Sequence, residues 1–134
     1  MKKKVLALCA DNTALSIVAE AVLSRYLADI EMLSAGLKAS KPLNANIKKA
    51  LTKESLWSQT LHTKALSDID ERHFNLVIIM SPKASKLAKE FSDESTVIEI
   101  EYEEPNYTNS TELARFIKTI KMELIPITRD ILEL

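Results

Sequence analysis

Four short runs of apolar residues separate longer segments with a helical period. The runs cover residues 4–9, 30–35, 76–80 and 96–100. The runs at 4–9 and 76–80 are apolar almost throughout, which is typical of a parallel strand covered on both faces. We therefore expect four β-strands over these ranges.

Between the runs, apolar residues recur every three or four positions, which predicts amphipathic helices. The first is expected to begin at the cap-type residues Asp11, Asn12 and Thr13 and to end near Leu27. Further helices are expected after Pro42, from Ser67 to Arg72, from Pro82 to Phe91 with Ser81 as the cap, and from Ser110 onward. Pro126 should end or kink the last helix and leave a helical tail to Leu134.

Alternating strands and helices predict an α/β fold, a three-layer open sheet of four parallel strands with helices on both faces. Right-handed crossovers make 2-1-3-4 the natural strand order. The 134 residues fit a single domain over 1–134. In such sheets a ligand binds beyond the carboxyl ends of the strands where the order reverses, which here is the loop that starts at Cys9.

Gly36 is the single glycine of the chain and closes the second expected strand. We expect it where φ is positive or where two backbones approach closely.

Composition excludes several classes of protein. The formal net charge of −1 gives no field that would attract nucleic acid or an anionic membrane surface. The apolar run after Lys4 is too short for a signal peptide, and no run is long enough to span a membrane. One cysteine and two histidines, His62 and His73, predict neither an internal disulfide nor a metal site. We expect a cytoplasmic protein without a cofactor.

Cys9 carries the candidate chemistry because it lies between a buried strand and a helix. The first amides of a helix have no intrahelical partners and lie at the positive end of its dipole, so they bind anions and favour a thiolate. A thiolate is the nucleophilic form of cysteine. The alternative is that Cys9 is a small residue of the core.

The segment 9–20, Cys-Ala-Asp-Asn-Thr-Ala-Leu-Ser-Ile-Val-Ala-Glu, resembles the phosphate loop of low-molecular-weight protein tyrosine phosphatases and the arsenate reductases related to them. The matching positions are Cys9, Asn12, Ser16, Ala19 and Glu20. Three further segments resemble the same family. They are Ser34-Ala35-Gly36, His62-Thr63-Lys64-Ala65-Leu66 and the strand 75–80. The resemblance implies the same 2-1-3-4 sheet.

The departures from the family pattern fall on its catalytic positions. Leu15 stands where the family has the arginine that grips the phosphoryl oxygens. Asp11 replaces a glycine and puts a carboxylate beside the anion site, and Ala14 replaces a second cysteine. Glu104, before Pro105, is the best match to the family's general acid. Efficient phosphatase action would need a lysine in place of the missing arginine. The candidates are Lys38, Lys41 and Lys64, and we expect each of them to be a solvated surface charge.

The resemblance implies phosphomonoester or oxyanion chemistry impaired by Leu15. Cys9 would be the nucleophile, Glu104 the general acid, and the substrate-binding loop would comprise Ala10, Asp11, Asn12, Thr13, Ala14, Leu15 and Ser16. Arsenate reduction would need an external thiol, because relay cysteines are missing. The ligand would be an oxyanion or a phosphorylated molecule. The alternative is a non-catalytic binding or regulatory module, a pseudophosphatase with a protein partner.

Overall fold

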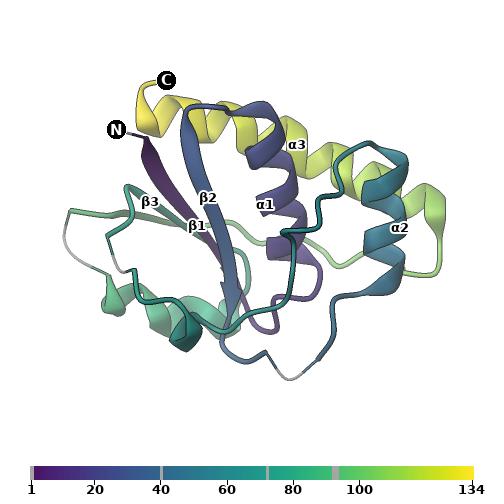
Figure 1. The fold of residues 1–134 in the computed structure, drawn as a ribbon, viewed down its shortest axis with the longest axis horizontal. Helices are drawn as coiled ribbons and strands as arrows, with labels where there is room; N and C mark the ends of the chain where they lie inside the picture. Colours follow the sequence, from purple (N-terminus) through teal and green to yellow (C-terminus); the bar gives the residue numbers. More distant parts are fainter. Residues whose placement is uncertain (1, 40, 72, 92–93) are drawn as a thin grey trace.

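The computed structural model describes residues 2–39, 41–71, 73–91 and 94–134. Figure 1 shows a sheet flanked by helices. The strands are β1 (Lys3–Cys9), β2 (Ile30–Gly36), β3 (Leu76–Ile79) and β4 (Thr96–Glu99). The helices are α1 (Leu15–Tyr26), α2 (Ala45–Lys53) and α3 (Ser110–Leu132), with two 3₁₀ helices, η1 (Leu66–Asp68) and η2 (Pro82–Glu90).

The sheet confirms the predicted topology. Its order is β2-β1-β3-β4, and every pairing is parallel. In the register, Cys9 at the end of β1 lies beside Gly36 at the end of β2. The carboxyl end of β1 is therefore central, with a neighbouring strand on each side.

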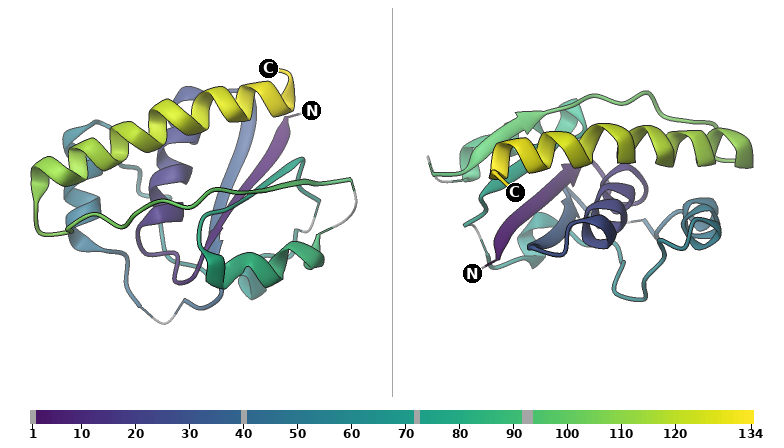
Figure 2. Two further views of the ribbon diagram at one scale, coloured as in Figure 1. Left: turned by 180° about the vertical axis from the view of Figure 1, so that it is seen from behind. Right: turned by 90° about the horizontal axis from the view of Figure 1, so that it is seen from above.

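The two faces of the sheet carry separate clusters of buried side chains. From β1, Val5, Ala7 and Cys9 belong to the cluster formed with α1 and α3, whereas Leu6 and Leu8 belong to the cluster formed with η2. This alternation follows from the two-residue period of a strand. Figure 2 shows the long helix α3 running across the sheet. Helices α1 and α3 pack on one face and η2 packs on the other, so helices cover both faces as predicted.

The start of the first helix differs from the prediction. Helix α1 begins at Leu15, and Asp11, Asn12 and Thr13 form a loop before it. Asn12 has a φ of 55°, the left-handed conformation that asparagine tolerates better than most residues. Its side-chain amide donates to the hydroxyls of Ser16 in α1 and Ser34 in β2, and its side chain does not cap the helix.

Three further expectations are corrected. The helix expected from Ser67 is a single 3₁₀ turn that ends at Asp68, and Arg72 lies outside the described residues. Ser81 precedes η2, but its side chain makes no capping hydrogen bond. Helix α3 does not end at Pro126, which is exposed, as is Met122 one turn earlier. Water can bond to the Met122 carbonyl that the proline leaves unpaired.

Across the residues that the structure describes, none of the helices combines the length and hydropathy that a bilayer crossing requires.

Candidate functional site

The loop after β1 is held against the end of β2 by backbone contacts. The Leu37 amide donates to the Ala10 carbonyl at 2.9 Å, and the Gly36 amide donates to the Lys64 carbonyl at 2.9 Å. A Cβ at Gly36 would lie 2.8 Å from the Asn12 nitrogen and 2.9 Å from the Ala10 oxygen. Of the two reasons expected for this glycine, the close approach of backbones is the one that applies.

The Cys9 sulfur lies between two hydrogen-bond donors. It is 2.8 Å from the Ser16 hydroxyl oxygen, and the Asn12 amide donates to it at 3.1 Å. The Asn12 side-chain amide donates to the Ser16 oxygen at 2.7 Å, so the hydroxyl hydrogen of Ser16 is free to point at the sulfur. The Ser16 hydroxyl and the Asn12 backbone amide can therefore both donate to the Cys9 sulfur.

The loop between Cys9 and α1 also offers backbone amides. Ala14 occupies the N-cap position of α1, and no side chain caps the helix there. The first amides of α1 have no partners within the helix and lie at the positive end of its dipole. Amides in this position can bind an anion.

The family's arginine position is filled by a buried side chain. Leu15 is 8% exposed and packs into the cluster on the α1 side of the sheet. Asp11 is partly exposed, and its carboxylate lies 3.7 Å from the Lys41 ammonium. Lys41 therefore offsets the Asp11 charge at the loop, whereas Leu15 contributes no charge.

One of the three candidate lysines was misjudged from the sequence. Lys64 is 8% exposed and forms an ion pair with buried Glu20, Nζ to Oε1 at 3.2 Å. It is neither a solvated surface charge nor a replacement for the arginine. Lys38 and Lys41 are exposed, as expected.

Glu104 lies on the segment between β4 and α3 and is exposed. Tyr107, on the same segment, is half-buried. Burial, together with the nearby charges of Glu104 and Cys9, raises the pKa of Tyr107 to about 12.

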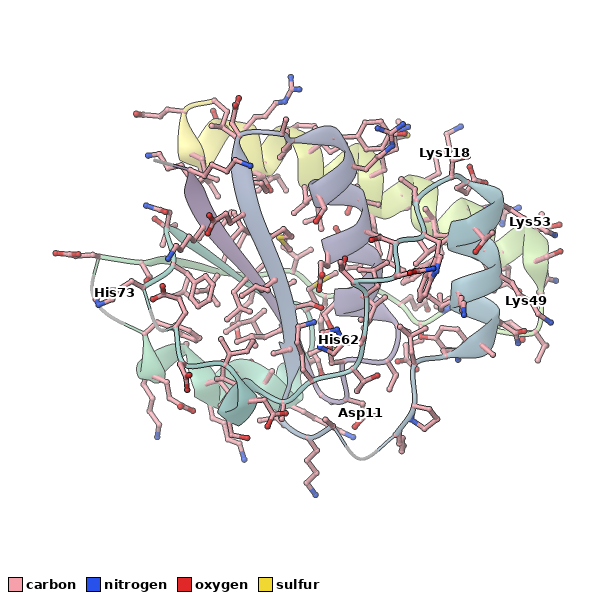
Figure 3. The ribbon with its side chains drawn as sticks, in the orientation of Figure 1. Asp11, Lys49, Lys53, His62, His73 and Lys118 are labelled. Carbon is pink, nitrogen blue, oxygen red and sulfur yellow. The ribbon has the colours of Figure 1, made fainter. Side chains whose placement is uncertain are left out.

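A groove of about 570 Å³ lies beside this phenol, between α2 and the start of α3, and Tyr107 forms part of its wall. Lys49 and Lys53 line it from α2. Figure 3 shows both lysines projecting from α2, well apart from Asp11 at the Cys9 loop. Lys48 also lines the groove, and its ammonium lies over the partly buried Trp57 ring, 4.9 Å from the ring centroid.

Figure 3 also shows His62 near the centre of the view and His73 at its left edge, well apart from each other. Within residues 2–39, 41–71, 73–91 and 94–134, no three histidine, cysteine or acidic side chains come together as metal ligands would.

Among the predicted site residues, Cys9, Asn12 and Ser16 are in mutual contact, while Thr13 is tied by its carbonyl to the amide of Asn44 at 3.0 Å. The prediction of the site omitted the buried side chains behind the loop. These are Glu20, Ser34 and Lys64. The segments that resemble the family contain all three, but a sequence alone does not show that they meet.

The model of the family "Low molecular weight phosphotyrosine protein phosphatase" matches residues 4–131. A thioredoxin-dependent arsenate reductase of Corynebacterium glutamicum is similar in structure, with a TM-score of 0.79 and 21% identity over 97% of this chain. This chain spans 62% of that protein's length. No curated protein matches the sequence.

Two other solved structures match over almost their whole length. An arsenate reductase in the phosphate binding state has a TM-score of 0.82 and 17% identity, over 96% of this chain and 98% of its own. The low molecular weight protein tyrosine phosphatase of T. tengcongensis has a TM-score of 0.69 and 22% identity, over 93% and 99%. These structures share the fold, and the family model covers nearly all of the sequence, so the chain belongs to the low molecular weight phosphotyrosine protein phosphatase family.

Proposed function

We propose that this protein binds phosphate-like oxyanions in the loop after β1 and hydrolyses phosphomonoesters slowly through Cys9. The observation that carries the proposal is the pair of donors on the Cys9 sulfur, Ser16 at 2.8 Å and the Asn12 amide at 3.1 Å. An arsenate reductase in the phosphate binding state has the same fold, which supports an oxyanion as the ligand.

In the proposed reaction the Cys9 thiolate attacks phosphorus and forms a phosphocysteine. The P–O bond to the leaving group breaks, and Glu104 gives its proton to the departing oxygen. Water then attacks phosphorus, Glu104 takes a proton from it, and the S–P bond breaks to release inorganic phosphate and the thiolate. The loop amides hold the non-bridging oxygens through both steps.

Leu15 is the reason to expect slow turnover. An arginine acting on a phosphoryl transition state contributes roughly 10³–10⁵ in rate. Backbone amides and Lys41 remain to balance the anion, and Lys41 is shared with Asp11.

The test is hydrolysis of p-nitrophenyl phosphate by the wild type, by Cys9→Ser and by Leu15→Arg. We expect weak turnover that Cys9→Ser abolishes, and a rise of roughly 10²–10³-fold in Leu15→Arg, the contribution of one preorganised oxyanion donor. Leu15→Met, which keeps the apolar volume, is the matched control and should stay at the wild-type rate. Thermal melting shows whether each variant is folded. Turnover that survives in Cys9→Ser would refute the assignment of the nucleophile.

The second candidate is a binding module without turnover, a pseudophosphatase. The buried Leu15 and the Asp11 carboxylate at the loop favour it. It predicts that inorganic phosphate protects Cys9 from iodoacetamide while neither the wild type nor folded Leu15→Arg hydrolyses the ester. If neither protection nor turnover is found, both candidates fail.

A further inference from the structure

The groove between α2 and the start of α3 continues into a second hollow along α3. The second hollow has a volume of about 460 Å³, and Glu54 and Ala114 line both hollows. We call the two together the α2/α3 groove. Both views in Figure 2 show α2 beside the N-terminal part of α3, so the groove lies between two helices at one end of the molecule.

Basic side chains gather around the α2/α3 groove. Among the residues that the structure describes, it is lined by six of the 18 basic residues of the chain and by one acidic residue, Glu54. The basic residues are Lys48, Lys49 and Lys53 from α2 and Arg115, Lys118 and Lys121 from α3. Figure 3 shows Lys49, Lys53 and Lys118 at the α2 end of the molecule. The net charge of −1 therefore conceals a positive groove on a chain whose other residues carry a net negative charge.

This clustering does not serve the stability of the helices. Lys49 and Lys53 are four positions apart on α2, and Lys118 is three positions from both Arg115 and Lys121 on α3. Like charges at these spacings are neighbours on a helix and destabilise it. In the part of the chain that the structure describes, Lys49, Lys53, Arg115 and Lys118 form no ion pair with a carboxylate. Their charges are available to an anionic partner.

Apolar side chains line the same groove. Ala45 and Ala50 come from α2, and Leu113 and Ala114 come from α3. Ala50 is half-buried and Leu113 is buried, so they lie deeper than the exposed lysines. Alanine leaves room for the side chains of a partner, and burial of apolar surface is a main source of affinity. Exposed cations above an apolar floor match a segment with apolar residues on one side and carboxylates on the other.

Two features favour a protein segment over a single strand of nucleic acid. Bases stack on aromatic faces that are free. Here the Lys121 ammonium lies over the Tyr26 ring, 4.3 Å from its centroid, and Lys48 lies over the Trp57 ring. Glu54, which lines both hollows, would also repel a continuous chain of phosphates at their junction.

The acidic segment of this chain itself is a poor occupant. Glu101, Glu103 and Glu104 are exposed between β4 and α3, but Ile100 and Tyr102 beside them pack against the core. From this segment, a second copy of the chain would offer carboxylates while these apolar side chains stay in its own core. A different protein fits the floor of the groove better.

We propose that the α2/α3 groove is a docking surface for an acidic amphipathic segment of a partner protein. The carboxylates of the segment pair with the lysines and Arg115, and its apolar side chains fill the space above Ala50 and Ala114. The inference goes beyond the proposed function and does not depend on turnover at Cys9. Complementary charge across such a surface speeds association and excludes basic partners.

The test is fluorescence anisotropy of a labelled peptide of about 15 residues, roughly four helical turns, with leucine on one face and glutamate on the other. The groove variant is Lys49→Glu with Lys118→Glu. The matched control is Lys83→Glu with Lys86→Glu, which changes the net charge equally at exposed lysines of η2, on the other face of the sheet. Thermal melting shows whether each variant is folded.

We expect saturable binding to the wild type that weakens as salt is added. The groove variant should bind about tenfold more weakly, because each substitution turns an attraction into a repulsion. The control variant should bind like the wild type. A second peptide, with serine in place of leucine, should bind the wild type about tenfold more weakly, because it leaves the apolar floor unfilled.

Equal binding by the groove and control variants would overturn the inference, since net charge alone would then decide. Equal binding of the leucine and serine peptides, or no saturable binding at low salt, would overturn it as well. These peptide comparisons use the wild type and so do not depend on how the variants fold. Tighter binding of a labelled oligothymidylate would assign the groove to nucleic acid instead. Self-association in sedimentation that the groove variant abolishes would assign it to a second copy of the chain.

Discussion

At the residue scale, the Cys9 loop leaves no room for a side chain at Gly36. The atoms that a Cβ would meet belong to the backbone of Ala10, Asp11 and Asn12, at 2.8–2.9 Å, and backbone cannot move aside as a flexible side chain can. The backbone of the Cys9 loop therefore fills the space in which a side chain at position 36 would lie.

Gly36→Ala should therefore act on the loop as well as on the fold. We expect a loss of about 1–3 kcal/mol in the free energy of unfolding, as for other overpacked sites, and slower alkylation of Cys9 because the Asn12 amide is pushed off the sulfur. Urea unfolding and iodoacetamide kinetics measure the two effects.

Ala35→Gly is the control for Gly36→Ala. It weakens the same strand through chain entropy, by about 1 kcal/mol, without adding an atom near the loop. Its alkylation rate should match the wild type. Equal slowing in both variants would mean that general destabilisation, and not contact with the loop, sets the reactivity of Cys9.

Single residues also show where prediction from the sequence stops. Cys9, Asn12 and Ser16 were identifiable because they lie within eight positions of one another and match a family pattern. Lys64 looked like a surface charge because nothing in its neighbourhood in the sequence shows that a buried carboxylate faces it from 44 positions away. Burial of a charge depends on the partner that the fold brings to it.

At the element scale, helix α2 is fixed at its start by one side chain. Asn44 accepts hydrogen bonds from the amides of Asn46 at 2.9 Å and Ile47 at 3.1 Å, and its own amide donates to the Thr13 carbonyl. The cap thus begins the helix at the point where the chain touches the Cys9 loop.

Removing this cap with Asn44→Ala should cost about 1 kcal/mol in the free energy of unfolding, because two helix amides lose their acceptor. Asn44→Asp keeps an acceptor oxygen and should retain most of that stability. Chemical denaturation of the three proteins provides the comparison. A loss in Asn44→Asp as large as in Asn44→Ala would show that the capping oxygen is not what stabilises α2.

The elements differ in how far the sequence determines them. The four strands were predicted to within one residue at each end. For β1 and β3 this follows because a strand buried on both faces is a continuous apolar run, whereas β2 and β4 have exposed positions among their apolar residues. The start of α1 was missed because Asp11, Asn12 and Thr13 are cap-type residues that here build a loop around Cys9. Short polar side chains that can cap a helix can also form hydrogen bonds that stabilise a loop.

At the scale of the whole molecule, the net charge of −1 gives no long-range attraction for an anion. Under the proposed function, affinity for phosphate comes from the loop amides and from the local balance between the charges of Asp11 and Lys41. A ligand that binds only the folded protein raises its stability by mass action, by about 2.7 kcal/mol at 100 times the dissociation constant. A rise in the melting temperature on adding phosphate therefore measures binding of phosphate to the folded protein.

We expect inorganic phosphate to raise the melting temperature of the wild type, with sodium chloride at equal ionic strength as the reference. Asp11→Asn removes a repelling carboxylate and should enlarge the shift, whereas Lys41→Met leaves Asp11 unopposed and should reduce it. Lys38→Met, at an exposed lysine nearby in the chain, should leave the shift unchanged. The same shift in all four proteins would mean that phosphate acts through general salt effects. Opposite changes in Asp11→Asn and Lys41→Met would locate the bound anion at the Cys9 loop, since these two side chains meet there.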